Sequence, residues 1–363
     1  SIEDTVSSLS SALEQIERLI GLPVEHAWIG MGGVDIISQI SKGVVAVAKS
    51  DGEIAEEDVE RAVEAARSIA PPINYEMMHL VPRGYSVDGQ TGIKDPAGMT
   101  GIRLEVETQI IHGLTSHIKN FTKAVYRAGI DIDDLVLSIL AAGDAVTTQR
   151  QKELGTTVVN IGSNMTSMVV YEEGDIIHVA TLPIGSGHVT NDLAIGLKTS
   201  IDVAEQVKLN FGDCLPSNYS SRDKIDLARL GAEESEKVNK KFIAEIIEAR
   251  MSEIFEKVNQ ELTNINRAGL LPAGIVYTGG GAKVEGVINL SKEILDLPAS
   301  LGYPVDILSS TEKINDLSFT TAIGLVKWGA RLQPSIKRSG GKGNGFFSKA
   351  VGGTKRLLRS LIP

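Results

Sequence analysis

The first third of the chain alternates segments that have helical and strand-like spacing of apolar residues. Residues 6–20 and 53–70 carry apolar side chains about every 3.6 positions, which predicts two amphipathic helices. The second opens with acidic residues and is followed by Pro71 and Pro72, which end a helix. Short apolar runs predict strands at 26–33, 44–48, 79–87 and 102–111, and the last two flank a turn-rich segment at 88–101. These elements together predict a small α+β unit.

The middle of the chain repeats this alternation around a second inserted block. A helix is predicted at 115–128, followed by a strand and a helix within 129–146. Residues 156–185 read as three strands joined by hairpin turns, and 274–287 as a buried strand, a glycine turn and the start of a helix. Between them, residues 191–268 form a long polar block with a helical pattern. The recurrence of β and α segments predicts two related α/β halves.

The last eighteen residues, 346–363, divide into an apolar face and a basic face at about 100° per residue. From 334 to 363 the chain has seven Lys or Arg residues and no Asp or Glu. Such a helix is typical of a segment that lies on an anionic membrane. We expect the membrane contacts to come from Phe346, Phe347, Val351, Lys355, Arg356, Leu357, Leu358, Arg359, Leu361 and Ile362.

The alternative for this segment is a helix that packs against the core. Gly352 and Gly353 would each cost such a helix about 1 kcal/mol in water. The Gly-rich, basic stretch at 334–345 has the composition of a flexible tether. Both features favour the membrane interpretation over the packing one.

Composition narrows the possible partners and compartment. The net charge is -10, and removing the seven positive charges of the tail leaves about -17 on the rest, which argues against nucleic acid as a partner. The single cysteine, Cys214, excludes an internal disulfide framework and suits a reducing cytoplasm. No apolar run approaches the length of about 20 residues that crosses a bilayer. We therefore expect a peripheral protein on the cytoplasmic side of the inner membrane. Because the chain opens with Ser1 directly on a helix, we also expect it to be N-terminally incomplete.

Three glycine-containing or charged segments have the spacing of a phosphate-binding cleft. In the first, 160–168, Gly162 permits close approach of backbone amides and Asn164 tolerates a positive φ. In the second, 204–212, Glu205 and Lys208 share one helix face, where a carboxylate can accept hydrogen bonds from a ribose. The third, 278–282, is a glycine turn that leads into a helix. The candidate nucleotide-binding residues are Asn160, Gly162, Ser163, Asn164, Thr166, Glu205, Lys208, Gly279, Gly280 and Gly281. Singly, each segment is more often an ordinary hairpin, a solvated helix face or a tight connection.

In this order, on a split α/β chain, the three segments resemble the actin-like ATPase superfamily and, within it, the FtsA family of bacterial cell division proteins. The most specific stretch is VDGQTGIKDPAGMTGIRLEVE at 87–107, because it belongs to the inserted subdomain (1C) that distinguishes FtsA from its relatives. The other segments that carry the resemblance are SKGVVAVA (41–48), EIAEEDVERAVEAA (53–66), GHVTNDLAIGLKTSIDVAEQVKLNFG (187–212) and FIAEIIEARMSEIF (242–255). The family also ends in a linker and a basic amphipathic helix.

The resemblance implies an α/β, actin-like two-domain fold of the split ribonuclease-H type, with the 1C insertion and with N-terminal strands missing. It divides the chain into a partial subdomain 1A at 1–32 and 111–150, 1C at 33–110, 2A at 151–198 and 270–333, 2B at 199–269, a linker at 334–345 and a membrane helix at 346–363. It also implies a role: anchoring the tubulin-like protein FtsZ to the membrane, self-association into protofilaments and recruitment of later division proteins.

The resemblance places the docking surface for the FtsZ tail in subdomain 2B. There, an exposed Arg250 and Lys257 can meet an acidic peptide, although both are equally explained as solvated helix residues. The alternatives to an FtsA-like scaffold are an active ATPase or phosphotransferase of the same fold, the actin-like scaffold of the type IV pilus machine, and a generic membrane-binding module.

The chain departs from the family at the nucleotide site. The family's first phosphate loop, Asp-x-Gly-Thr, is absent from this sequence. The second is Asp-Ile-Gly-Gly-Gly-Thr-Thr-Asp in the family, and here Asn160 replaces the first Asp, which removes a charge that Mg²⁺ favours. We therefore expect ATP with Mg²⁺ as the ligand, bound as a structural cofactor and hydrolysed slowly or not at all. No catalytic residue and no metal-ligating residue of the protein is predicted.

Overall fold

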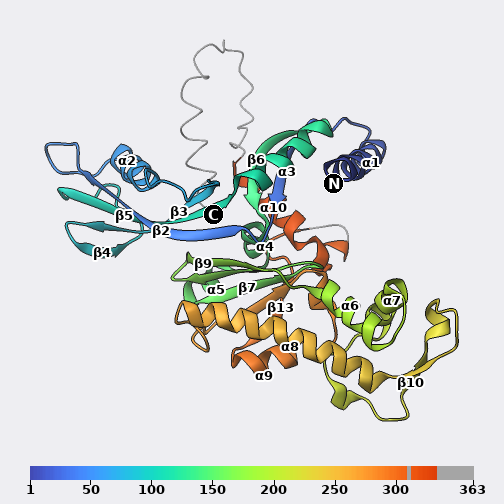
Figure 1. The fold of residues 1–363 in the computed structure, drawn as a ribbon. Coiled ribbons are helices and arrows are strands. Elements are labelled where there is room, and N and C mark those ends of the chain that lie inside the picture. The colour runs from blue at the N-terminus through green and yellow to red at the C-terminus, as the bar shows by residue number, and fades with distance from the viewer. Residues whose placement is uncertain (309–311, 333–363) are drawn as a thin grey trace. The chain divides into compact units, whose positions relative to one another are not determined.

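The computed structural model describes residues 1–308 and 312–332, which separate into two compact units (Figure 1). Unit 1 comprises residues 1–141 together with the described residues from 324 onward, and unit 2 comprises residues 142–323. The boundaries fall within the helices α4 (Ser138–Val146) and α10 (Thr320–Leu332). The predicted linker at 334–345 and the predicted membrane helix at 346–363 lie outside the described residues.

The first part of unit 1 consists of a long N-terminal helix, a second helix that contacts it, and a pair of parallel strands. Helix α1 (Ile2–Ile20) starts at a capping box of Ser1 and Asp4, and it ends at Gly21 with φ 71°. Its Glu3 carboxylate accepts two hydrogen bonds, at 2.8 and 2.9 Å, from the Arg127 guanidinium at the end of α3 (Thr115–Arg127). Strands β1 (His26–Met31) and β6 (Asp131–Leu137) pair in parallel. The sequence pattern had placed these elements within a few residues of their observed ends.

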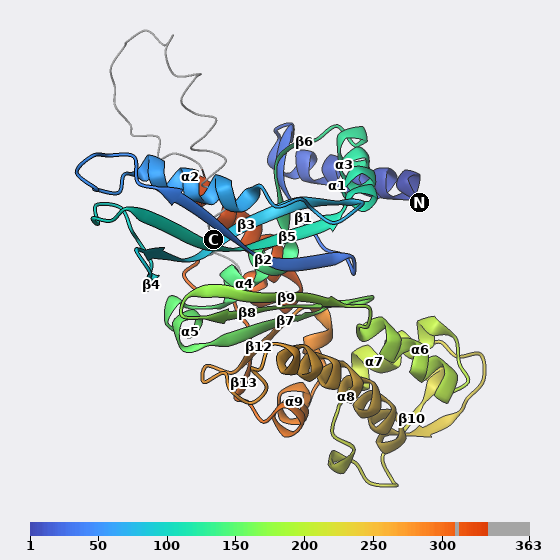
Figure 2. The same cartoon turned by 60° about the vertical axis from the view of Figure 1, so that its left-hand side comes forward.

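The inserted part of unit 1 is a four-stranded antiparallel sheet covered on one face by a helix (Figure 2). Its strand order is β2 (Ile36–Ala46), β5 (Arg103–Leu114), β3 (Tyr75–Val87) and β4 (Gln90–Ile93). The strand predicted at 44–48 was too short. The beginning of β2 was not recognised because the stretch from Ser38 to Lys42 is mostly polar. Strand β4 was missed because it lies within the turn-rich segment after the turn at Asp88 and Gly89, both of which have positive φ.

Helix α2 (Glu56–Arg67) packs on this sheet with almost no space between the backbones. A Cβ at Gly43 of β2 would lie 1.9 Å from the Ala62 carbonyl oxygen, so only glycine fits there. The Asp58 carboxylate is buried and accepts hydrogen bonds from the amides of Ala55, at 3.0 Å, and Ala48, at 3.2 Å, and from Arg61. The hydrogen bond from Ala55, joined by that from Arg61, holds the pKa of Asp58 below its usual range despite burial. The apolar core beneath α2 consists of Ile54, Ala62, Val63, Ala66, Leu80, Val87, Leu104, Val106 and Ile110.

A buried histidine ties the inserted sheet to the rest of unit 1. His79 of β3 accepts a hydrogen bond at its Nε2 from the Leu137 amide, at 2.9 Å, and its ring meets Trp328 of α10 edge-on at 5.9 Å. The Trp328 indole donates to the Asp134 carboxylate at 3.1 Å. Burial lowers the pKa of His79 to about 4, so the ring is neutral near pH 7 and able to accept.

Unit 2 is organised around a five-stranded mixed sheet. Its order is β13 (Ala299–Leu301), β12 (Ile275–Thr278), β7 (Thr156–Ile161), β8 (Thr166–Glu172) and β9 (Asp175–Leu182). Strands β7, β12 and β13 are parallel, and β7, β8 and β9 form the antiparallel meander expected from the sequence. Helix α5 (Gln149–Leu154) precedes β7, and α9 (Val287–Leu295) follows β12.

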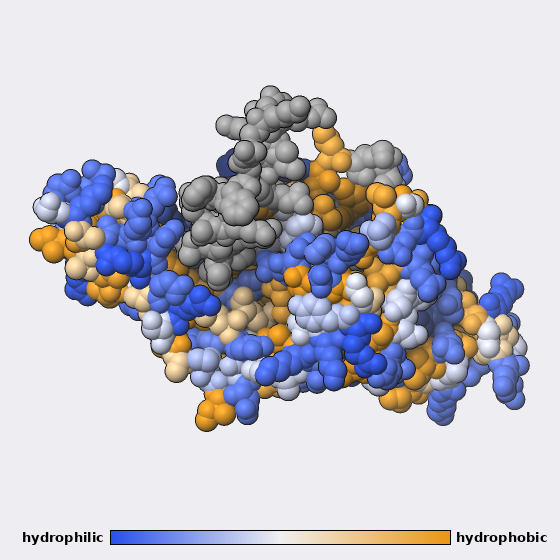
Figure 3. All heavy atoms as spheres, turned by 90° about the horizontal axis from the view of Figure 1, so that it is seen from above, coloured by the Kyte–Doolittle hydropathy of each residue, from blue (hydrophilic) through white to orange (hydrophobic). Residues whose placement is uncertain are grey.

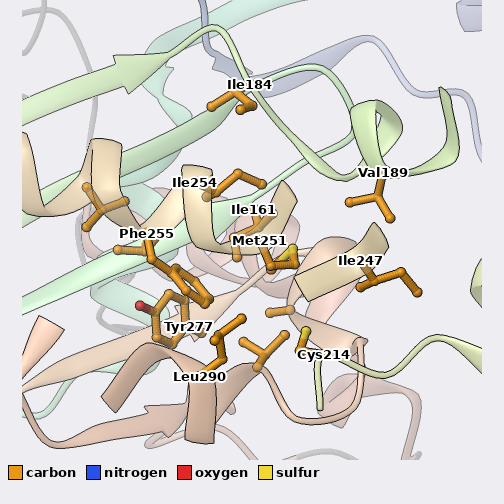
Figure 4. Packing of buried hydrophobic residues seen from close by; sticks show 14 of the residues in the cluster. Ile161, Ile184, Val189, Cys214, Ile247, Met251, Ile254, Phe255, Tyr277 and Leu290 are labelled. Carbon is orange, nitrogen blue, oxygen red and sulfur yellow. The ribbon is translucent and has the colours of Figure 1, made fainter. Parts of the chain in front are cut away.

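The core of unit 2 lies between this sheet and the 25-residue helix α8 (Lys240–Asn264), as Figure 4 shows. Met251, Ile254 and Phe255 of α8 point toward Ile161 of β7 and Tyr277 of β12. The Phe255 and Tyr277 rings lie 5.4 Å apart at 57°. The buried Tyr277 hydroxyl is within 2.7 Å of the Ser291 hydroxyl, so its polar atom is satisfied.

The predicted helical block at 191–268 is wrong in its middle third. Helices α6 (Ser186–Gly196) and α7 (Ile201–Phe211) precede α8, but residues 212–239 form two short 3-10 turns and the hairpin strands β10 (Lys224–Asp226) and β11 (Lys237–Asn239). Pro216 lacks an amide for a helix, and Gly231 has φ 102°. Side chains of Ser220, Asp223 and Asp226 hydrogen-bond to local backbone amides or hydroxyls instead of supporting a helix.

Hydrophilic and hydrophobic residues are interspersed over the face of the described chain seen in Figure 3. Large apolar side chains are strongly exposed at Leu19, Ile73, Ile102 and Ile195. No helix within residues 1–308 and 312–332 is both long enough and apolar enough to cross a membrane.

The neutral state of His79 predicts an acid-sensitive unit 1. The histidine pKa is near 6.5 in the unfolded chain and about 4 in the folded one, so between these values the unfolded state binds more protons. Stability from this group is complete above pH 6.5 and is lost as the pH falls toward 4. We expect the unfolding free energy to drop by about 2 kcal/mol between pH 7 and pH 5 from His79 alone.

Urea denaturation of His79→Gln at both pH values measures this contribution. Burial also lowers the pKa of His112 and raises that of Asp134, so these groups contribute to the pH dependence as well. The change in unfolding free energy with pH is therefore compared between the variant and the wild type. The half-exposed His117, which faces Asp35 at 3.0 Å, supplies the control His117→Gln. An unchanged pH slope in His79→Gln contradicts the assignment.

Candidate functional site

The carboxyl ends of two parallel strands bring two of the three candidate segments together. Asn160 of β7 is the register partner of Thr278 of β12, so the loop at 162–165 and the turn at 279–281 leave neighbouring strand ends. A Cβ at Gly281 would lie 2.4 Å from the Ile161 side chain. One at Gly279, which has φ 88°, would lie 2.6 Å from the Ile161 carbonyl oxygen. Glycine is therefore required at both positions for the turn to approach β7.

The loop after β7 is held by the first turn of α6. The Gly162 amide donates to the Met165 carbonyl oxygen at 2.9 Å, which closes the loop. The Ser186 amide, at 2.8 Å, and its hydroxyl, at 3.1 Å, donate to the Gly162 carbonyl oxygen, and the Gly187 amide donates to that of Ser163 at 2.8 Å. Asn164, a residue type that tolerates a positive φ, does not adopt one in this loop.

This first turn of α6 was missed by the sequence analysis. A Cβ at Gly185 would lie 2.5 Å from the Gly162 carbonyl oxygen, and one at Gly187 would lie 2.8 Å from the Ser163 hydroxyl. Both glycines are thus needed for the helix to reach the loop. The available signal was the pattern Gly-Ser-Gly at 185–187, directly between a strand and a helix.

Four backbone amides remain available at these strand ends. Those of Ser163 and Asn164 in the loop, and of Gly280 and Gly281 in the turn, donate to no protein acceptor within residues 1–308 and 312–332. A Cβ at Gly280 would meet only the Ser318 hydroxyl, at 3.7 Å, so this residue borders open space. Adjacent free amides of this kind form concave sites for anions.

Thr166 occupies a different environment from the other candidates. It is fully buried at the start of β8, and its hydroxyl donates to the Ile184 carbonyl oxygen at 2.8 Å. This hydrogen bond fixes the end of the meander behind the loop. The geometry thus gives Thr166 a supporting position beneath the candidate anion site.

The candidate segment at 204–212 is linked to the loop at 162–165 through the buried Thr190. Lys208 of α7 donates to the Glu205 carboxylate at 2.7 Å, to the Thr190 hydroxyl at 2.8 Å and to the Ser186 carbonyl oxygen at 3.3 Å. Thr190 in turn donates to the Glu205 carboxylate at 2.5 Å. The ammonium group of Lys208 is therefore fully engaged by the protein, and it connects α7 to the turn that holds the 162–165 loop.

Glu205 is kept ionised by this network. Burial raises its pKa, but the hydrogen bonds from Lys208 and Thr190 outweigh that effect, so the pKa lies below its usual range. The Glu205 side chain is 38% exposed, which leaves carboxylate lone pairs accessible. A charged, partly exposed acceptor is suited to sugar hydroxyls.

The neutral Asn160 stands at the position where the related pattern has an acid. Its side-chain amide lies 3.5 Å from the Thr321 hydroxyl, as a weak donor. Within the described ranges, no three His, Cys, Asp or Glu side chains gather as a metal site. The residues at the strand ends thus provide amide donors for an anion.

A separate groove of about 390 Å³ lies between α6 and α8. The sequence predicted an exposed Arg250, but the structure shows its side chain mostly buried. Only 25% of its side chain is accessible, because it forks onto the Asp192 carboxylate at 2.6 and 2.9 Å and also contacts Glu253. Lys257 is 46% exposed and lies 3.7 Å from Glu253, one turn beyond the groove. The groove is lined by Asp192, Ile195, Gly196, Ile246, Ala249, Arg250 and Glu253.

Comparison with known proteins identifies this arrangement. A family model described as cell division protein FtsA matches residues 157–324, and one described as the SHS2 domain inserted in FtsA matches residues 33–112. Cell division protein FtsA of Pseudomonas aeruginosa is 33% identical over 332 residues, which cover 92% of this chain and 79% of that protein. FtsA of Bacillus subtilis is 35% identical over 330 residues, with 91% and 74% covered.

Solved structures agree on the fold. The PilM-PilN type IV pilus biogenesis complex contains a chain similar to this one, with a TM-score of 0.61 and 17% identity over 90% of this chain and 85% of that one. At this identity the likeness concerns the fold alone, so it does not favour a pilus scaffold. The two matching family models and the identity to curated relatives lead to a direct conclusion: the chain has an actin-like α/β fold and belongs to the FtsA family of bacterial cell division proteins.

Proposed function

We propose that this protein is a division scaffold that holds FtsZ at the cytoplasmic face of the membrane. The observation that carries the proposal is the groove between α6 and α8, which offers an apolar wall beside a guanidinium that already binds a carboxylate. Family membership supports the partner. The basic amphipathic segment at 346–363, outside the described residues, supports the membrane attachment.

The groove has features suited to a short acidic peptide. Ile195 on its wall is 76% exposed, so an apolar side chain of a ligand gains burial there without displacing a protein group. Gly196 lets the end of α6 approach α8, since a Cβ would lie 2.6 Å from the Ile246 side chain. A peptide carboxylate would compete with Asp192 for Arg250 or share it. Lys257 adds a second positive charge one turn along α8.

The strand ends of unit 2 support ATP as a structural ligand. The free amides at 163–164 and 280–281 suit phosphate oxygens, and Glu205 suits ribose hydroxyls. ATP supplies two or three linked phosphates for these donors to bind. Lys208 positions Glu205, since its ammonium donors are all used by protein acceptors. With Asn160 in place of an acid, hydrolysis is slow or absent, and the nucleotide stabilises the conformation that self-associates.

The groove predicts a specific loss of binding to FtsZ. Ile195→Glu should raise the Kd for the C-terminal FtsZ peptide about tenfold or more, because it removes an apolar contact and adds a charge that repels acidic residues. Fluorescence anisotropy with a labelled peptide measures the Kd. The matched control is Ile201→Glu on α7, an isoleucine that is 61% exposed and lies outside the groove. Equal effects of the two variants would remove the groove from the proposal.

Asn160 predicts weak Mg²⁺ dependence of ATP binding. In the wild type, labelled ATP should bind with similar affinity in Mg²⁺ and in EDTA. Asn160→Asp should make binding about tenfold tighter in Mg²⁺ than in EDTA, because it restores a charge that interacts with the ion. Asn210→Asp, on the exposed face of α7, controls for net charge. Rapid ATP turnover by the wild type contradicts the structural role.

The tail predicts attachment to anionic membranes. Leu358→Glu combined with Leu361→Glu should lower co-sedimentation with phosphatidylglycerol vesicles at least about tenfold, since each buried CH₂ contributes roughly 0.8 kcal/mol. Leu19→Glu with Ile73→Glu makes the same change at exposed positions of unit 1 and should leave co-sedimentation intact.

Electron microscopy of the same vesicles reports filaments of the self-associating protein, and a pull-down from them reports later division proteins. Unchanged co-sedimentation of the tail variant contradicts the anchor. If vesicles saturated with the wild-type protein carry no filaments, self-association is contradicted.

A further inference from the structure

A basic pocket of about 530 Å³ lies on unit 2 among the end of α7, the hairpin β10–β11 and the start of α8. Five of its nine lining residues are cationic, and the remaining four are one carboxylate, Asp226, and the apolar Phe211, Ile225 and Leu230. It shares no residue with the candidate nucleotide site or with the groove of Arg250. The five cations that line it are Arg222, Lys224, Arg229, Lys237 and Lys240.

The five cations lie near two carboxylates but contact neither of them directly: Arg229 and Lys237 interact electrostatically with Asp226, and Lys240 with Asp223. In the part of the chain that the structure describes, none of them forms an ion pair. The nearby acids are occupied by other donors. Asp226 accepts from the Ser235 hydroxyl at 2.9 Å and the Ala228 amide at 3.1 Å, and Asp223 accepts from the Ser220 amide and hydroxyl. Five cations against the single lining carboxylate, Asp226, leave a local excess of positive charge in a chain whose net charge is -10.

The start of α8 adds to this positive potential. This 25-residue helix begins with Lys240 and Lys241, and its first turn has no acidic residue. Helix α2, in contrast, has three acids in its first turn, which is the arrangement that a helix dipole favours. Two cations at the positive end of a long helix are unfavourable alone, and a bound anion offsets this repulsion because it is attracted both to the cations and to the helix N-terminus.

Two aromatic rings hold one of the cations, Lys240, in place. The Lys240 ammonium lies 4.9 Å from the centre of the Phe211 ring and 5.8 Å from that of Tyr219. These cation–π contacts restrict the lysine before any ligand arrives, which lowers the entropic cost of binding. The pocket volume also falls in the range of small-molecule sites.

We propose that this pocket binds a ligand that carries clustered phosphate groups, either free in solution or as the headgroups of lipids. Phosphate chemistry fits because it concentrates several charges within one small volume, and because arginine forks and lysine ammonium groups both bind phosphate oxygens. An extended acidic peptide fits less well. Its carboxylates on one side are spaced by about 7 Å, and the strands β10 and β11 are only three residues long.

The test uses the full chain and two variants with equal net charge. The pocket variant combines Arg222→Gln, Arg229→Gln and Lys237→Gln. The control combines Lys119→Gln, Lys123→Gln and Lys292→Gln, which are exposed lysines outside the pocket. Circular dichroism and thermal unfolding confirm that both remain folded. Calorimetric titration with tripolyphosphate measures binding of a soluble phosphate ligand. Co-sedimentation with vesicles of phosphatidylglycerol and phosphatidylcholine measures binding to lipid headgroups.

The two arms distinguish the source of the phosphates. If the ligand is free, the pocket variant raises the Kd for tripolyphosphate about tenfold or more relative to wild type and control, and the wild-type Kd rises steeply with KCl. The vesicle arm is run with Leu358→Glu and Leu361→Glu present in every protein, so that the tail does not mask the pocket. If the ligand is a headgroup, the pocket variant then loses the remaining vesicle binding and tripolyphosphate does not compete with vesicles. The proposal is overturned if the pocket variant matches the control in both arms, or if hexaglutamate binds the pocket more tightly than tripolyphosphate.

Discussion

The close approach of β7 and β12 is the constraint on which the functional part of unit 2 depends. Glycines at 279 and 281 let the turn after β12 lie against Ile161, at distances that a side chain would prevent. The same pattern recurs where Gly185 and Gly187 bring α6 onto the loop after β7. Backbone meets backbone at both junctions, so amides rather than side chains form the surface of the site. Most of these glycines are therefore explained by packing first, and their effect on a ligand follows from that packing.

The polar network around Lys208 complements this backbone arrangement. A single ammonium group joins α7, the buried Thr190 and the carbonyl oxygen of Ser186, and so it joins Glu205 to the turn that holds the loop at 162–165. Because each of its donors has an acceptor, burial of the charge is compensated. Glu205 then presents a charged carboxylate whose position is set by two neighbours. The site is preorganised by contacts within one unit.

Sequence patterns predicted the regular elements well because their spacing is a local property. The meander at 156–182 and the helices α1, α2 and α3 were confirmed to within a few residues. The hairpin at 224–239 was not predicted, since its strands are three residues long and its neighbours are polar. The state of Arg250 was also missed, because its partner Asp192 lies 58 positions away on another helix. The role of Gly185 and Gly187 depends on a contact with the 162–165 loop that no local pattern encodes.

The inserted sheet of unit 1 has a mechanical consequence. Strand β3 runs for 13 residues and pairs with β5 along most of that length, with irregularities between Met77 and His79 and between Pro82 and Gly84. From His79, where β3 meets Leu137, to the tip at Val87, the strand extends about 26 Å. A bulge bends a strand locally, so the ribbon deforms most easily at its two irregularities. A partner that presses on the tip at β4 would therefore bend it first between Pro82 and Gly84, the irregularity nearer the tip.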